Sequence, residues 1–189
     1  MKNTKIKNTV LSALFLAIGI VLPFFTGQIP EIGSMLLPMH IPVFLAGLIC
    51  GPIYGAMVGF ILPVLRSMIF IMPPMYPKAI GMAFELATYG LVSGYLYEKS
   101  PWKCTKALYK ALLTSMVIGR VVWGVSQLIL LGVKGKAYTI TAFMTGAFLE
   151  AIPGILLQLV IIPTIMVALK RARLVPIKRH KEEKPCKMN

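Results

Sequence analysis

Four ionisable side chains stand inside otherwise apolar stretches of the chain: Arg66, Glu85, Arg120 and Glu150. Apolar stretches of this length belong in lipid, where such a charge costs at least ~2.5–3.5 kcal/mol unless it faces a partner or a water-filled cavity. Residues of this kind usually mark a functional site. Guanidinium and carboxylate groups in these positions can bind the polar groups of a solute, relay ions or protons, or join helices as ion pairs.

The depth of each charge along its predicted helix indicates how the four groups pair. At ~1.5 Å per residue, Arg66 lies about 8 Å below the outer end of its helix and Glu85 about 10 Å below the start of the next. By the same measure Arg120 and Glu150 lie about 20 Å and about 15 Å down. We therefore expect an outer pair, Arg66 with Glu85, and an inner pair, Arg120 with Glu150. Each pair either contacts a ligand or only ties two helices together, and depth alone leaves both interpretations open.

The segment 72–77, Met-Pro-Pro-Met-Tyr-Pro, stands directly above the outer pair. Proline lacks an amide hydrogen and disfavours helix in the residue before it, so this segment is predicted to be an irregular loop. We expect Tyr76 and His40 to close over a ligand that Arg66 and Glu85 anchor. For His40 the alternative, a polar residue near the membrane interface, stays open.

Aromatic side chains complete the predicted substrate site. Tyr76, Tyr89 and Trp123 offer flat faces on which a planar ligand ring can stack. The open alternative is the aromatic belt that membrane proteins place at the lipid interface. No residue is predicted to be catalytic, because the chain contains no P-loop, no H-E-x-x-H and no G-x-S-x-G motif. We therefore expect a protein that is not an enzyme.

The composition identifies an integral membrane protein. Hydrophobic residues make up 57% of the chain and charged residues 14%, whereas a soluble domain carries about 25% charged residues. The net charge of +14 does not indicate nucleic-acid binding, because no basic stripe interleaved with aromatic residues occurs in any segment. The only histidines are His40 and His180, and the three cysteines are far apart, so neither a metal site nor a disulfide is predicted. No cofactor is expected.

The apolar pattern predicts an all-α fold of six transmembrane helices within residues 1–170, followed by a basic cytoplasmic tail at 171–189. Glycines 47, 51, 55 and 59 recur every fourth residue around a Gly51–Pro52 turn, which predicts a short glycine-rich hairpin of the second and third helices. Whether this hairpin crosses the membrane or re-enters it stays open, because its first arm has roughly 12 residues and is about 18 Å long. The expected helices are Asn8–Phe25, Pro38–Cys50, Pro52–Phe70, Ala79–Tyr97, Ala107–Gly132 and Thr139–Leu169.

The distribution of basic residues predicts the orientation. Three clusters, Lys2–Lys7, Lys99–Lys110 and Lys170–Lys187, hold 15 of the 20 lysines and arginines. Because cytoplasmic loops of membrane proteins are enriched in Lys and Arg, both termini are expected in the cytoplasm and the protein in the cell membrane.

The first helix carries a face of small residues, Ala13 and Ala17, four positions apart. Small-xxx-small faces let two helices approach closely in lipid. The partner of this face is either another protein or a helix of the same chain.

With these features the chain resembles the substrate-capture (S) components of energy-coupling factor (ECF) transporters, which are bacterial importers of vitamins and related micronutrients. The resemblance covers roughly residues 8–170. It rests on the length, six helices with both ends inside, Ala13-x-x-x-Ala17, the Gly51–Pro52 turn and the proline-rich loop before the fourth helix.

The resemblance implies both partners and a mode of action. In that family the alanine face docks on a transmembrane coupling subunit, two cytoplasmic ATPases drive the cycle, and the capture component topples in the membrane. The substrate, a small vitamin-like molecule, sits in the outer half under the loops that correspond to Gly27–Leu37, Ile71–Pro77 and Val133–Tyr138. The rival interpretation is a self-sufficient secondary carrier or channel that uses the Arg/Glu pairs as a relay, but no inverted repeat is evident. A ligand-free scaffold would leave the buried charges unexplained.

Overall fold

The computed structural model describes residues 2–23, 38–71, 73–100, 105–133 and 152–171, and every regular element in these ranges is helical. A π-helical turn, η2 (Met75–Ala79), precedes α5. The predicted helices recur with ends shifted by a few residues; of the last one, only Ile152 onward lies in the described part. Residues 172–189, the predicted tail, and Glu150 lie outside the described residues. The α-helices are α1 (Lys2–Val21), α3 (His40–Cys50), α4 (Pro52–Phe70), α5 (Ile80–Lys99), α6 (Thr105–Val133) and α8 (Ile152–Arg171).

Helices α3, α4 and α5 pack backbone to backbone through glycines. A Cβ atom at Gly55 of α4 would lie 2.5 Å from Cα of Gly47 in α3, and one at Gly94 of α5 would lie 2.6 Å from the carbonyl oxygen of Gly47. Gly90 of α5 meets the α4 backbone at Gly55. The predicted close-packing glycines therefore form one seam shared by three helices, since no larger residue leaves room for these approaches.

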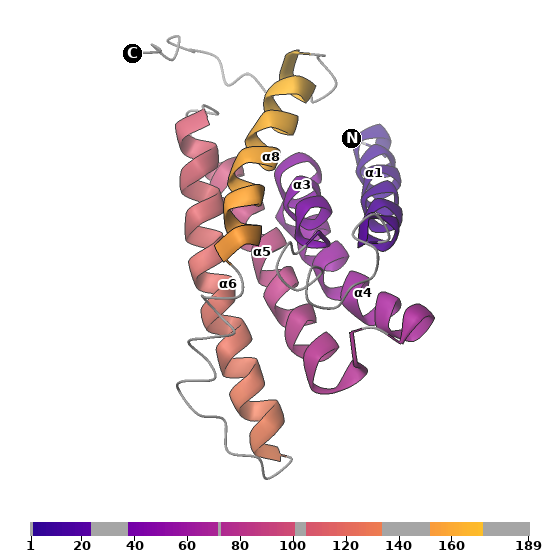
Figure 1. Ribbon diagram of the computed structural model, residues 1–189. Helices are drawn as coiled ribbons and strands as arrows, with labels where there is room; N and C mark the ends of the chain where they lie inside the picture. The colour runs from indigo at the N-terminus through magenta and orange to yellow at the C-terminus, as the bar shows by residue number, and fades with distance from the viewer. Residues whose placement is uncertain (1, 24–37, 72, 101–104, 134–151, 172–189) are drawn as a thin grey trace.

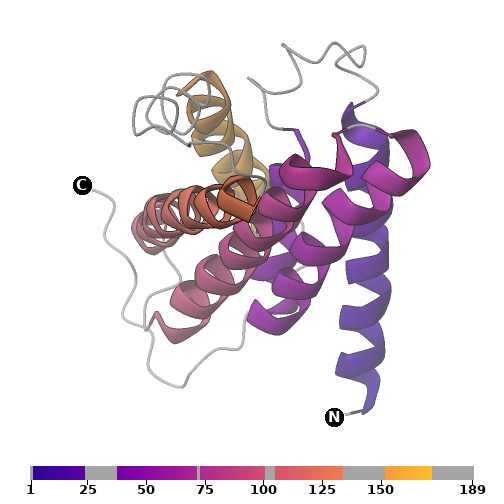
Figure 2. The same cartoon turned by 90° about the horizontal axis from the view of Figure 1, so that it is seen from below.

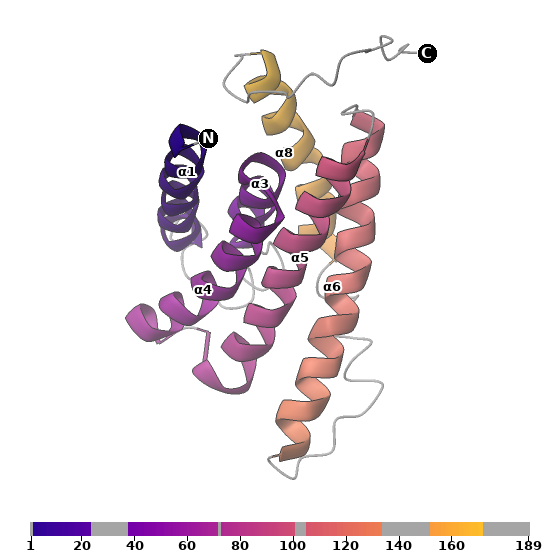
Figure 3. The same cartoon turned by 180° about the vertical axis from the view of Figure 1, so that it is seen from behind.

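The remaining helices flank this trio on two sides. Helix α1 packs on α3 and α4, while α6 packs on α5, and α8 contacts α3 and α6. Figures 2 and 3 show α1 at one side of the body and α6 with α8 at the other. Helices α3, α4 and α5 are therefore covered by other helices on both sides.

Basic helix ends gather at one end of the body. The start of α1, the end of α5, the start of α6 and the end of α8 all point to the upper end in Figure 1, and η2 and the end of α6 lie toward the lower end. A hydrogen bond of 3.0 Å from Asn8 Nδ2 to the carbonyl oxygen of Cys50 places the end of α3 beside the first turns of α1. This gathering of basic ends is the arrangement that a positive-inside orientation requires.

The connection from α4 to α5 is irregular, as the prolines predict. Helix α4 ends at Ile71, whose φ of 60° is left-handed, and its amide donates to the carbonyl oxygen of Ser67 at 3.0 Å. The Ser67 hydroxyl donates to the carbonyl oxygen of Pro73 at 2.7 Å. Within η2, Tyr76 has extended dihedral angles, φ −119° and ψ 131°. The prolines thus impose a sharp turn over the ends of α4 and α5.

Three of the described helices are long and apolar enough to cross a membrane: Thr4–Val21 of α1, Pro52–Phe70 of α4 and Thr105–Gly132 of α6. Helix α3 and the stretch Gly154–Leu169 are apolar but shorter. Large apolar side chains such as Val10, Ile53, Val117 and Leu128 are exposed on the outer surface of the bundle. A lipid environment explains this exposure, and the protein is membrane-embedded.

Candidate functional site

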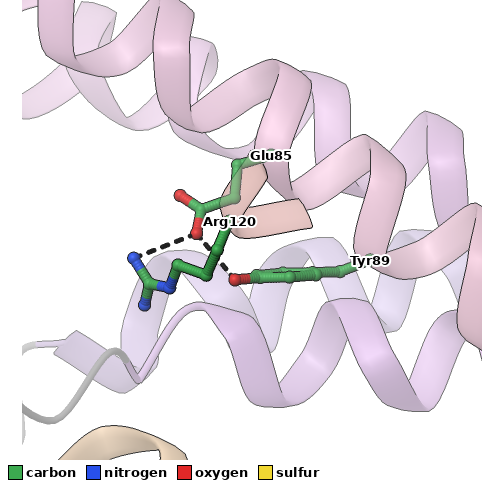
Figure 4. Close-up of polar contacts among 3 residues, drawn as sticks. All are labelled: Glu85, Tyr89 and Arg120. Carbon is green, nitrogen blue, oxygen red and sulfur yellow. Dashed lines mark hydrogen bonds and ion pairs between the residues drawn. The ribbon is translucent and has the colours of Figure 1, made fainter. Parts of the chain in front are cut away.

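A buried polar centre, formed by Glu85 and Tyr89 of α5 with Arg120 of α6, lies between these two helices (Figure 4). Arg120 Nη1 lies 3.2 Å from Oε1 of Glu85, and the Tyr89 hydroxyl donates to the same oxygen at 2.7 Å. Glu85 is 2% exposed and Arg120 6%. Two charged groups so far from water are stable only with these partners, because each alone would bear a large desolvation cost.

Contacts between the polar centre and η2 fix the register of α5 against α6. The hydroxyl of Tyr76, just before α5, donates to the carbonyl oxygen of Leu130. Glu85 follows Tyr76 by nine residues and Arg120 precedes Leu130 by ten, so the two antiparallel helices bring these charges to one level. A Cβ at Gly81 would lie 2.5 Å from Nε2 of Gln127, which agrees with this register.

The predicted pairing of Arg66 with Glu85 is therefore wrong, because Glu85 pairs with Arg120. The depth count assumed that the outer ends of the helices are level. The contact of Tyr76 with Leu130 instead puts these two residues at one level, from which Glu85 and Arg120 lie nine and ten residues away. Arg120 is therefore not an exclusive partner of Glu150, as the predicted inner pair would require. Glu150 itself lies outside the described residues.

An aromatic wall covers the polar centre on the side of α3. The Tyr89 ring stacks on Phe44 with centroids 5.1 Å apart and an interplanar angle of 24°. His40, the first residue of α3, lies 5.4 Å from the Tyr89 ring centroid, and its side chain is buried. The interfacial alternative for His40 concerns its depth in the membrane and stays open. A Cβ at Gly119 of α6 would lie 3.0 Å from Cζ of the same ring, so the lack of a side chain at Gly119 leaves room for the Tyr89 ring.

Some buried side-chain donors of α6 and α8 lack hydrogen-bond partners. Nε of Arg120, Nε2 of Gln127 on α6 and Nε2 of Gln158 on α8 have no hydrogen-bond partner, and the two glutamines are 4% and 1% exposed. Most buried polar atoms in proteins are satisfied, so exceptions call for an explanation. Gln127, Gln158 and Phe44 were not predicted as site residues; a glutamine within an apolar helix is the sequence signal that identifies the first two.

The other predicted site residues lie on three elements. Arg66 is buried on α4, Tyr76 joins η2 to α6, and Trp123 is half-buried on α6, three residues after Arg120. The structure thus joins Glu85, Tyr89, Arg120 and His40 through direct contacts. The part of Arg66 and Trp123 in the site stays a prediction.

The alanine face of α1 points outward. Ser12, Phe15 and Gly19 are the buried side of this helix, and Gly19 fits against Leu62 of α4. Ala13 and Ala17 are exposed on another side. Within the described residues these alanines are therefore available to a partner, and the intramolecular alternative loses its support.

In the described ranges no three His, Cys, Asp or Glu side chains come together, so these ranges contain no cluster of potential metal ligands. The polar centre instead offers charged and polar donors beside aromatic faces. This is the chemistry of a site for a small polar molecule.

The fold defines a membrane-embedded helical protein, and the polar centre is its candidate site. The sequence profile of the family described as "ECF transporter, substrate-specific component" matches residues 7–166. The chain belongs to this family, and its role is accordingly substrate binding in ECF transport. No curated protein and no solved structure matches it.

Proposed function

We propose that this protein is the high-affinity capture component of an ATP-driven importer and that its substrate is a vitamin or related small micronutrient. The observation that carries the proposal is the family match over residues 7–166. The buried polar centre supports it, because a partly satisfied set of polar groups under an irregular loop suits a ligand that completes the hydrogen bonds.

The proposed orientation places both termini in the cytoplasm and the helical bundle in the cell membrane, with the short α3–α4 hairpin either crossing the membrane or re-entering it. The clustered basic helix ends support this orientation. Lysines 5, 7, 99, 106 and 110 belong to these ends. The η2 turn then lies at the outer face, above the polar centre, where a solute arrives from outside.

The proposed partners are a transmembrane coupling subunit and two ATPase subunits. The chain carries no P-loop motif, so energy must come from other proteins. The exposed face with Ala13 and Ala17 supports α1 as the docking helix, because small side chains permit close helix approach in lipid.

Reconstitution into liposomes tests the energy source. The purified protein alone should bind substrate without accumulating it, and uptake against a gradient should require the coupling subunit, the ATPases and ATP. Accumulation by the protein alone, driven by a proton or sodium gradient, would establish the secondary-carrier alternative.

A bulky substitution tests the docking face. Ala13→Trp with Ala17→Trp should abolish co-purification with the coupling subunit while ligand affinity stays within about twofold, since the α1 surface lies away from the polar centre. A matched control is Val117→Trp with Val121→Trp, which enlarges two exposed side chains four residues apart on α6, away from the alanine face. Retained co-purification of the alanine variant would contradict the docking role.

A further inference from the structure

Arg120 uses only part of its hydrogen-bonding capacity. Its Nη1 contacts Glu85, whereas its Nε is buried and has no hydrogen-bond partner. A guanidinium carries five N–H donors and no acceptor, and it stays charged. Whatever satisfies Nε must therefore be an acceptor.

The unused donor belongs to the side-on edge of the guanidinium. Nε and Nη2 present two parallel N–H bonds along this edge, and a carboxylate with its two oxygens matches them in a bidentate pair. Figure 4 shows the contact to Glu85 made through the end of the guanidinium. The contact to Glu85 thus leaves the side-on edge available.

Glu85 is held in place by a second donor. Its Oε1 accepts hydrogen bonds from both the Tyr89 hydroxyl and Arg120. The Tyr89 ring is itself fixed by stacking on Phe44. Glu85 and Tyr89 are therefore positioning residues that orient the guanidinium, and they do not occupy its side-on edge.

We propose that the side-on edge of Arg120 binds a carboxylate of the transported solute; this inference rests on the proposed function. A cationic group would be repelled there, and a neutral carbonyl would form a weaker contact without the charge. Gln127 lies two helical turns nearer the outer end of α6, with its buried Nε2 also lacking a partner. Seven residues at ~1.5 Å each place this amide about 10 Å from Arg120 along the helix.

The solute is accordingly a small monocarboxylate with a second polar group roughly 10 Å from the carboxylate. The carboxylate enters first and lies deep, and the other polar group stays near Gln127 beneath η2. An ordered water is the competing acceptor for Nε, and it would give no preference for carboxylates.

The first measurement identifies what the protein carries. The full chain, purified in mild detergent from cells grown in rich medium, is analysed by native mass spectrometry for co-purified small molecules. Binding is then measured for biotin and pantothenate, for their uncharged counterparts biotinamide and pantothenol, and for the cation thiamine. We expect a co-purified carboxylate, and a carboxylate that binds about 10- to 100-fold more tightly than its uncharged counterpart.

The second measurement assigns the preference to Arg120. Arg120→Lys keeps the positive charge but lacks the bidentate edge, so the carboxylate preference should fall to a few-fold while the variant remains folded. The matched control is Ser115→Ala on the same helix, a buried residue whose hydroxyl donates to the carbonyl oxygen of Leu112. It should retain the full preference.

Each alternative outcome is distinguishable. A neutral or cationic best ligand overturns the carboxylate assignment but leaves the capture function standing. An undiminished preference in Arg120→Lys shows that the carboxylate binds elsewhere. Absence of any ligand, both co-purified and from the panel, counts against the proposed function itself.

Discussion

Removing one charge of the buried pair tests whether Glu85 and Arg120 depend on each other. Their atoms lie 3.2 Å apart, and the two side chains are 2% and 8% exposed. Glu85→Leu would leave the guanidinium buried and uncompensated, which costs about 3–5 kcal/mol. At about 2–4 °C of melting temperature per kcal/mol for a chain of this size, the expected decrease is roughly 6–20 °C.

The double variant Glu85→Leu with Arg120→Met separates the effect of the ion pair on stability from the effect of burying each residue alone. Replacing a buried ion pair by apolar residues of similar volume is often neutral or stabilising. The double variant should therefore recover most of the melting temperature lost by either single variant, although it no longer binds the solute. The assay is thermal unfolding of the detergent-solubilised protein without ligand. Additive losses in the double variant would refute the coupling, and so would a single variant as stable as the wild type.

Three further predictions concern the scaffold. Gly90→Ala should lower the melting temperature by several degrees, because a Cβ there meets the α4 backbone. Gly132→Ala should leave it unchanged, because the space around Gly132 is open. Equal effects of the two substitutions would contradict the glycine seam. Ile71→Gly should stabilise the protein by up to about 1 kcal/mol in thermal unfolding, because the left-handed φ of Ile71 strains a branched side chain that is 81% exposed. Destabilisation by this substitution would count against that strain. Asn8→Ala should cost about 0.5–1.5 kcal/mol by removing the bond to the Cys50 carbonyl, and an unchanged melting temperature would show that this bond ties no helices together.

Local physical chemistry in the sequence determined the elements of this protein. Apolar length defined the helices, Gly51–Pro52 the turn, and the prolines of 72–77 the irregular connection before α5. The glycine spacing anticipated close backbone contacts, because the absence of a Cβ is a property of the residue itself.

Tertiary structure alone decided which charges meet. The pairing depends on the register of α6 along α5. This register is set by interhelical contacts of Tyr76, Gln127 and Gly119, and not by the conformational preference of any single residue. The depth count placed Glu85 about 10 Å and Arg120 about 20 Å below the helix ends, so it assigned Glu85 to Arg66 instead of Arg120. The sequence thus identified the buried charges, but the packing of two helices selected which of them pair.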